Sequence, residues 1–156
     1  MTTRKSSRAD HLAVCACLSA GLWLATPAHA ALGDTATPIA GATTSTIASG
    51  AARVLSYVDA GGTTINEYIA PTNNEIFAYS WEGPTMPNLQ TLLGRHYASY
   101  RSGAAAVLAT QPGNLHNAHV DQTDVIVETG GQMRSYVGRA WLPAALPAHV
   151  SEGDLQ

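Results

Sequence analysis

The sequence has 156 residues, a length that suits one domain with a modest hydrophobic core. Its 8 Lys and Arg residues and 11 Asp and Glu residues give a formal net charge of −3 at pH 7. This acidic balance argues against a nucleic-acid partner, because phosphate binding requires a concentration of positive charge.

The first thirty residues have the three-part order of a secretory signal. A charged start, MTTRKSSRAD, is followed by the short apolar run HLAVCACLSAGLWLAT and then by PAHA, which ends in small residues at Ala28 and Ala30. Residues 1–30 are therefore predicted to be a signal peptide that is cleaved after Ala30. The alternative is an uncleaved amino-terminal anchor, which the well-formed small-residue site disfavours.

Removal of this segment would narrow the chemistry open to the chain. Lys5 is the only lysine, and Cys15 and Cys17 are the only cysteines, so all three would leave with the signal. The processed chain would then lack Schiff-base lysines, thiol nucleophiles, disulfides and thiolate metal ligands. We expect a periplasmic or secreted protein with no stable membrane insertion after cleavage, and no cofactor is indicated.

Residues 31–52 are rich in Ala, Thr, Gly and Ser and contain few side chains large enough to bury. Such a composition predicts a flexible leader. The folded part is then expected at residues 53–156, as a single α+β domain with an extended carboxy-terminal tail.

Three β-prone runs follow the leader, separated by DAGG and PTNN, which are rich in turn-forming residues. This spacing predicts an antiparallel meander. If residues 71–74 form a four-residue loop, Ile69 faces Ile76 and Tyr68 faces Phe77. Alternation then gives one face an aromatic row of Tyr68, Phe77, Tyr79 and Trp81, and gives the other face Glu67 with Ile65, Ile69, Ile76 and Ala78.

After the break EGPTMP, apolar residues recur at helical spacing from Leu89 to Tyr100, behind Asn88 as a helix cap. We expect this amphipathic helix to cover the isoleucine face. The aromatic row is a candidate binding surface, and the alternative is that it belongs to a core, as aromatic side chains on a strand more often do.

A second hairpin is predicted from residues 123–128 and 132–141, with TGG as its three-residue loop. In this register Val127 pairs with Met133, so Met133 and Val137 are expected to be buried and Arg134 to point away from the core. The predicted fold is α+β: a small antiparallel sheet of about five strands, a meander plus a carboxy-terminal hairpin, with one main amphipathic helix packed on one face. The proline-containing tail is expected to shield part of the aromatic side.

Three blocks of the sequence resemble a known family. They are ALG at residues 31–33, EYIAP with IFAYSWEGPTMPNLQTLLG at residues 67–71 and 76–94, and GGQMRSYVGRAWLPAALPAHVS with LQ at residues 130–151 and 155–156. Together they are similar to the exported bacterial proteins catalogued as domain of unknown function 2844. The resemblance implies a small periplasmic or secreted protein without an established activity, so it assigns no catalytic residue. The loop GNLHNAHVDQTD lies outside it.

That loop holds the densest set of metal-ligating side chains in the chain. Two imidazoles and two carboxylates fall within nine residues, a ligand set that suits zinc or another borderline cation. The alternative is a polar surface loop, because a metal site also needs hydrogen-bond partners that fix its ligands. The candidate ligands are His116, His119, Asp121 and Asp124.

Glu67 is a second candidate, because its place on the isoleucine face would bury a carboxyl group that needs a partner. Arg95 and His96 on the helix are the expected partners. In a hydrolase, Glu67 would be a buried acid with a raised pKa and His96 its proton partner. The simpler interpretation is a structural pair, since nucleophile motifs such as Gly-x-Ser-x-Gly are absent.

Three function classes therefore stay open. The leading hypothesis is an exported, non-enzymatic binding or structural module, with another exported protein as a possible partner. The alternatives are a small hydrolase that uses Glu67 and His96, and a metal-binding protein that uses the loop from His116 to Asp124. The sequence does not indicate an oligomeric state.

Overall fold

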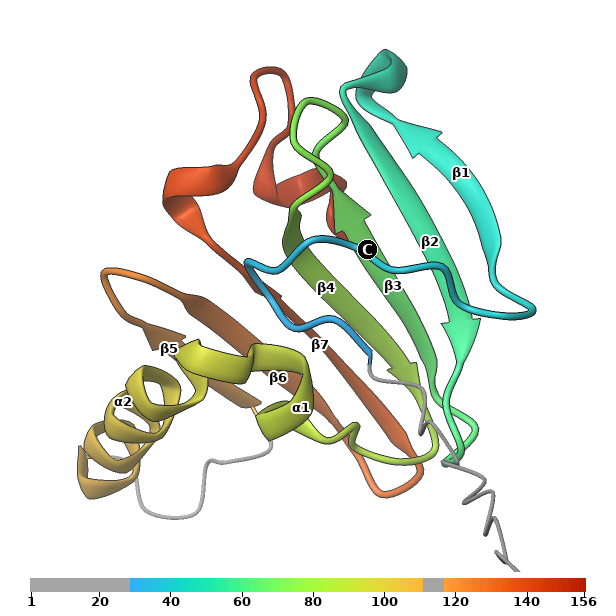
Figure 1. Cartoon of the computed structure of the whole chain (residues 1–156). Coiled ribbons are helices and arrows are strands. Elements are labelled where there is room, and N and C mark those ends of the chain that lie inside the picture. Colours follow the sequence, from blue (N-terminus) through green and yellow to red (C-terminus); the bar gives the residue numbers. More distant parts are fainter. Residues whose placement is uncertain (1–28, 111–116) are drawn as a thin grey trace, which may run out of the picture.

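The computed structural model describes residues 29–110 and 117–156. Their core is one antiparallel sheet of seven strands in the order β1-β2-β3-β4-β7-β6-β5 (Figure 1). The predicted α+β class is confirmed, but the sheet is larger than the expected five strands. The strands are β1 Thr43–Ile47, β2 Ala52–Val58, β3 Thr64–Ile69, β4 Ile76–Gly83, β5 Ala118–Asp121, β6 Ile126–Gln132 and β7 Ser135–Trp141.

The helical segment follows β4 and consists of α1 Leu89–Leu93, the 3₁₀ turn η2 Gly94–His96 and α2 Tyr97–Thr110. Asn88 caps it as expected, because its side chain accepts a hydrogen bond from the backbone N–H of Thr91. Shorter 3₁₀ turns are η1 Ala48–Gly50, η4 Pro143–Ala145 and η5 Glu152–Asp154. Among the described residues, no helix is long and apolar enough to cross a membrane.

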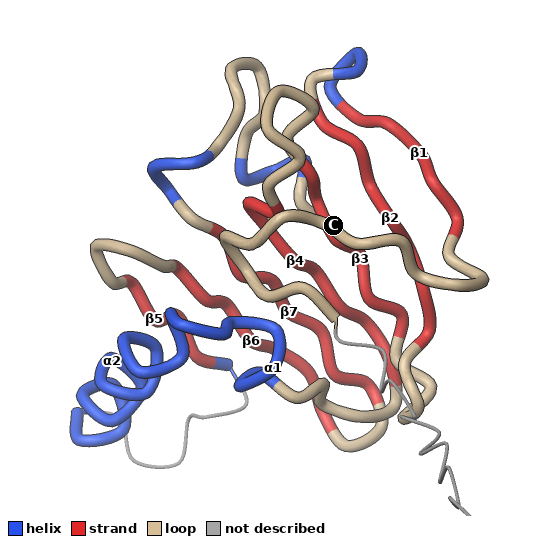
Figure 2. The backbone as a smooth tube through the Cα atoms, in the orientation of Figure 1, coloured by secondary structure: helices blue, strands red, loops and turns tan. Residues whose placement is uncertain are grey.

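The expected leader is held against the sheet, which corrects the prediction of a flexible segment at residues 31–52. Leu32 is fully buried, and its backbone N–H donates to the Leu92 carbonyl oxygen at 2.8 Å. Strand β1 also lies in this stretch and pairs with β2. Figure 2 shows the preceding loop crossing the face of the sheet. The composition of the segment did not predict this order, because a single leucine and backbone hydrogen bonds hold it in place.

A bulge divides the predicted aromatic row between the two faces. Ile69 pairs with Ile76 as expected, but the next pair is Tyr68 with Ala78, so Phe77 is an extra residue on β4. One inserted residue reverses the alternation of every side chain beyond it. Tyr79 and Trp81 therefore join the isoleucine face, while Tyr68 and Phe77 stay on the other face with Ala78.

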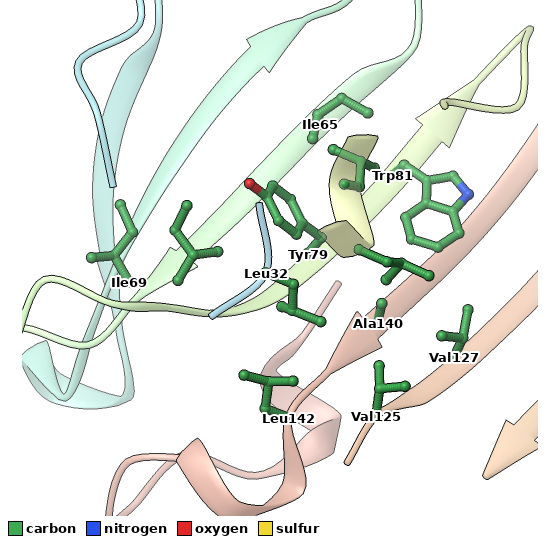
Figure 3. Packing of buried hydrophobic residues seen from close by; sticks show 12 residues of the cluster. Leu32, Ile65, Ile69, Tyr79, Trp81, Val125, Val127, Ala140 and Leu142 are labelled. Carbon is green, nitrogen blue, oxygen red and sulfur yellow. The ribbon is translucent and has the colours of Figure 1, made fainter. Parts of the chain in front are cut away.

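Both faces of the sheet are covered. On the first face, α1 and the amino-terminal segment pack over the isoleucines, in the cluster shown in Figure 3. This confirms the expected position of the helix. On the second face, Leu155 from the carboxy-terminal tail is buried against the cluster that contains Tyr68, Phe77 and Trp141, so the tail shields that side as expected.

The second hairpin has a different register from the predicted one. The TGG residues lie within β6, and the turn is formed by Met133 and Arg134 between the pair Gln132 and Ser135. Arg134, the second residue of this turn, takes a left-handed φ of 67°. Met133 is 90% exposed and Val137 is 50% exposed, so the expected burial of both was wrong.

Candidate functional site

Glu67 is a carboxyl group buried in the middle of the sheet. It lies on β3 opposite Tyr79 on β4, and its side chain is fully buried, as the isoleucine-face prediction required. Burial raises the pKa of Glu67 to about 7, and the hydrogen bond from the Tyr79 hydroxyl and the nearby Tyr57 hydroxyl oppose this shift. The same burial raises the pKa values of both tyrosines.

The hydroxyl of Tyr79 has two hydrogen-bond acceptors at this site. It lies 2.6 Å from the Ala30 carbonyl oxygen and 3.1 Å from Oε1 of Glu67, and it has one proton to donate. A carbonyl oxygen only accepts. The Ala30 carbonyl oxygen and Glu67 therefore compete for the single proton of the Tyr79 hydroxyl.

Glu67 and His96 do not form the expected pair. Nδ1 of His96 lies 2.9 Å from Oδ2 of Asp124, and Ser99 donates to the other oxygen of Asp124 at 2.6 Å. These bonds lower the pKa of Asp124, with the Ser99 bond the larger cause. Nε2 of His96 accepts from Nε of Arg95 at 3.3 Å. His96 thus joins the helical segment to the β5–β6 connection, a structural contact.

The residues of the proposed metal loop lie in separate contacts. His119 on β5 pairs with Glu128 on β6 at 3.1 Å, whereas Asp124 pairs with His96. Asp121 is exposed, and His116 lies outside the described residues. Within residues 29–110 and 117–156, no group of three or more His, Cys, Asp or Glu side chains is placed to hold a metal ion.

The aromatic candidates are core residues. Tyr68, Phe77, Tyr79 and Trp81 are each at most 2% exposed, so none offers a ring to a ligand. Tyr68 still has a polar role, because its hydroxyl donates to the Gln156 backbone carbonyl oxygen at 2.6 Å.

A groove of about 820 Å³ lies beside that contact, on the second face of the sheet. Its floor and walls come from β3, β4, β6 and β7, and Leu155 and Gln156 form one end. The side chains that line it are mainly hydrogen-bonding groups, among them Thr64, Asn66, Ser80, Glu82, Glu128 and Arg139.

Two hydrogen-bond networks hold four of these groups in place: Asn66, Ser80, Glu128 and Arg139. Nδ2 of Asn66 donates to Ser80 at 3.1 Å and to the Gln156 carbonyl oxygen at 3.2 Å. On the other wall, Nε of Arg139 lies 2.6 Å from Glu128 Oε2, and the guanidinium group stacks over Trp141 at 5.2 Å. The Arg139 hydrogen bond lowers the pKa of Glu128. These four polar groups of the groove are therefore pre-organised.

Sequence reasoning missed this groove. The sequence of β3 did contain a sign of it. Thr64 and Asn66 alternate with Ile65, so two polar side chains lie on the same face of this strand. Arg139 and Glu128 are brought together only by the register of β6 with β7.

Comparison with known proteins gives one match. A family model with the description Protein of unknown function (DUF2844) matches residues 28–155. No curated protein and no solved structure matches the chain.

Proposed function

The chain belongs to this family of unknown function, and on that premise we propose that it is an exported, non-enzymatic module that binds a polar, extended segment of another exported protein. The groove on the second sheet face carries the proposal. The groove is open to solvent and is lined by fixed hydrogen-bonding groups. Its volume of about 820 Å³ is large enough for several residues of a peptide ligand.

The charges in the groove favour binding over proton transfer. Arg139 and Glu128 are paired with each other, and the lowered pKa of Glu128 keeps it ionised at neutral pH. A general acid or base works best with a pKa near the working pH. Glu67 has such a pKa, but it is buried and does not line the groove.

Two observations support export. The first thirty residues carry the charged, apolar and small-residue regions of a secretory signal. The family match begins at residue 28, so nearly all of that segment lies outside the family domain.

Site-specific photo-cross-linking in living cells tests the binding function. A photo-reactive residue at Val137, which is half exposed on the groove wall, should form adducts with a distinct partner. The same residue at Val58, which is 66% exposed but outside the groove, is the matched control. Adducts at both positions, or at neither, would contradict a partner in the groove.

A further inference from the structure

The segment around Ala30 and Ala31 lies beside the buried acid. The Ala30 carbonyl oxygen accepts from the Tyr79 hydroxyl, which also contacts Glu67. The next backbone nitrogen, that of Ala31, donates to Oδ2 of Asp34 at 3.2 Å. Figure 3 shows the Tyr79 hydroxyl directed toward the amino-terminal segment. The peptide bond between Ala30 and Ala31 therefore stands between Asp34 and the Tyr79–Glu67 pair.

The three residues after that bond fit their place closely. Ala31 packs on Gly94, where an added Cβ would come within 2.5 Å of the alanine methyl group. Leu32 is fully buried. Gly33 has a φ of +83°, and an added Cβ there would come within 2.3 Å of the Arg95 guanidinium group. This tight fit fixes the position of the Ala31 nitrogen.

Glu67 lacks a positive partner in the part of the chain that the structure describes. Its Oε2 atom has no hydrogen-bond partner there. Arg95 bonds Gly33 and Asp34, and His96 bonds Asp124. A buried carboxyl group in this position is stable only when neutral or when paired with a cation. The titratable and charged groups that face this site are Tyr57 from β2, His29, which stacks on Tyr57 and precedes the cleaved bond, Asp59 from the turn after β2, Tyr79 from β4, Asp34 from the segment itself, and Arg95 and His96 from η2.

We propose that cleavage of the Ala30–Ala31 peptide bond supplies the missing cation, because the new ammonium group of Ala31 is held between Asp34 and the Tyr79–Glu67 pair. The inference rests on the export proposed above. Water adds across the C–N bond, so that Ala30 leaves as a carboxylate and the Ala31 nitrogen takes up protons to become ammonium. The departing Ala30 carbonyl releases the Tyr79 hydroxyl, which then donates to an ionised Glu67.

The charge arrangement predicts the direction of two titrations. A cation beside Glu67 favours its ionised form and lowers its pKa. The same pairing favours the protonated amine, whose pKa rises above the usual value of about 7.7–8.0 for an α-amino group. Burial alone would have the opposite effect on an amine, so the direction of its shift distinguishes the paired amino terminus from a merely buried one.

The processed chain offers a clean reporter for this test. Lys5 is the only lysine and leaves with the signal, so the α-amine of Ala31 would be the only amine in the protein. Intact mass first establishes that the purified exported protein begins at Ala31. Brief acetylation across a range of pH then gives the apparent pKa of the amine, with the urea-unfolded chain as the reference.

We expect the native amine to titrate above the unfolded one. Glu67→Gln should return the apparent pKa of the Ala31 amine toward the value of the unfolded chain. For each unit by which this pKa falls, acetylation at pH 7 should become about tenfold faster. Glu152→Gln removes an exposed carboxyl group that lies outside both this site and the groove lining, and it should change neither quantity. If Glu67→Gln does not fold, Tyr79→Phe and Asp34→Asn provide the same comparison from the other contacts.

Two failures are distinguishable. A mass that begins at a residue other than Ala31 overturns the inference at its first step, together with the proposed cleavage site. A chain that begins at Ala31 but titrates at or below the unfolded value, or equally with and without Glu67, overturns the ammonium site while leaving export and the groove intact.

Discussion

Gly138 on β7 lies directly opposite Trp81 on β4, and a Cβ atom at position 138 would come within 2.4 Å of the indole ring. The glycine leaves room for the indole ring of Trp81, one of the two fully buried tryptophans of the sheet. This contact closes the first face of the sheet where β7 joins the meander.

Replacing this glycine should destabilise the protein. In Gly138→Ala the new methyl group would meet the Trp81 ring and, at 2.6 Å, the backbone oxygen of Glu128, and we expect this crowding to cost about 1–3 kcal/mol of unfolding free energy. Gly153→Ala is the control, because its added Cβ would have no contact closer than 3.6 Å. Urea denaturation of the two variants measures the difference, and equal stabilities would show that the ring is free to move.

The amino-terminal segment should contribute strongly to stability. Leu32→Ala removes a fully buried side chain and should cost about 2–5 kcal/mol. Thr37→Ala, at an exposed position of the same segment, should have little effect. Thermal or urea melts test both variants. If neither changed the melting midpoint, the segment would be a flexible leader in solution after all.

The hairpin register leads to a paired prediction. Val127 is fully buried and pairs with Ala140, whereas Met133 is at the exposed tip. Val127→Ala should therefore cost about 1–3 kcal/mol, from lost methyl groups and an incompletely filled cavity. Met133→Ala should leave the urea midpoint unchanged. Similar losses from both substitutions would support the shorter hairpin, with TGG as its loop.

Glu67 predicts a pH dependence for a chain that keeps Ala30 before Ala31, such as one produced in the cytoplasm as Met followed by residues 29–156. Burial raises the folded-state pKa of Glu67 from its ordinary value of 4.5 to about 7. The stabilisation is fully present below about pH 4.5 and is lost as pH rises toward 7. Glu67→Gln should remove this part of the pH dependence of the melting temperature. A wild-type slope that persists in the variant would assign it to other groups.

Part of the fold could be predicted because local signals agreed with tertiary packing. The Asn88 cap, the pairing of Ile69 with Ile76 and the helix over the isoleucine face all follow from turn residues and periodicity. No local sequence pattern indicated the bulge at Phe77, because the bulge depends on the packing of both faces of the sheet. The hairpin turn was predicted at Gly130 and Gly131 because glycine favours turns. The turn instead contains Arg134, which takes the left-handed conformation.

The candidate site was only partly predictable for a similar reason. Alternation on β3 placed Glu67 on the buried face, but its neighbours depended on the bulge, which brought Tyr79 opposite it in place of Ala78. His96 was at the expected point on the helical segment, yet its partner came from a connection 28 residues later. Contacts set by distant strands are not encoded in local spacing.

Thiol accessibility in the native envelope tests the binding groove most directly. The chain after Ala30 has no cysteine, so Val137→Cys and Val58→Cys would each place one thiol in the processed protein. If a partner fills the groove, labelling of Val137→Cys should be at least about tenfold slower in intact cells than in purified protein, while the Val58→Cys rate stays the same after correction for reagent entry. Equal ratios at the two positions would contradict the proposal that this groove is the binding site.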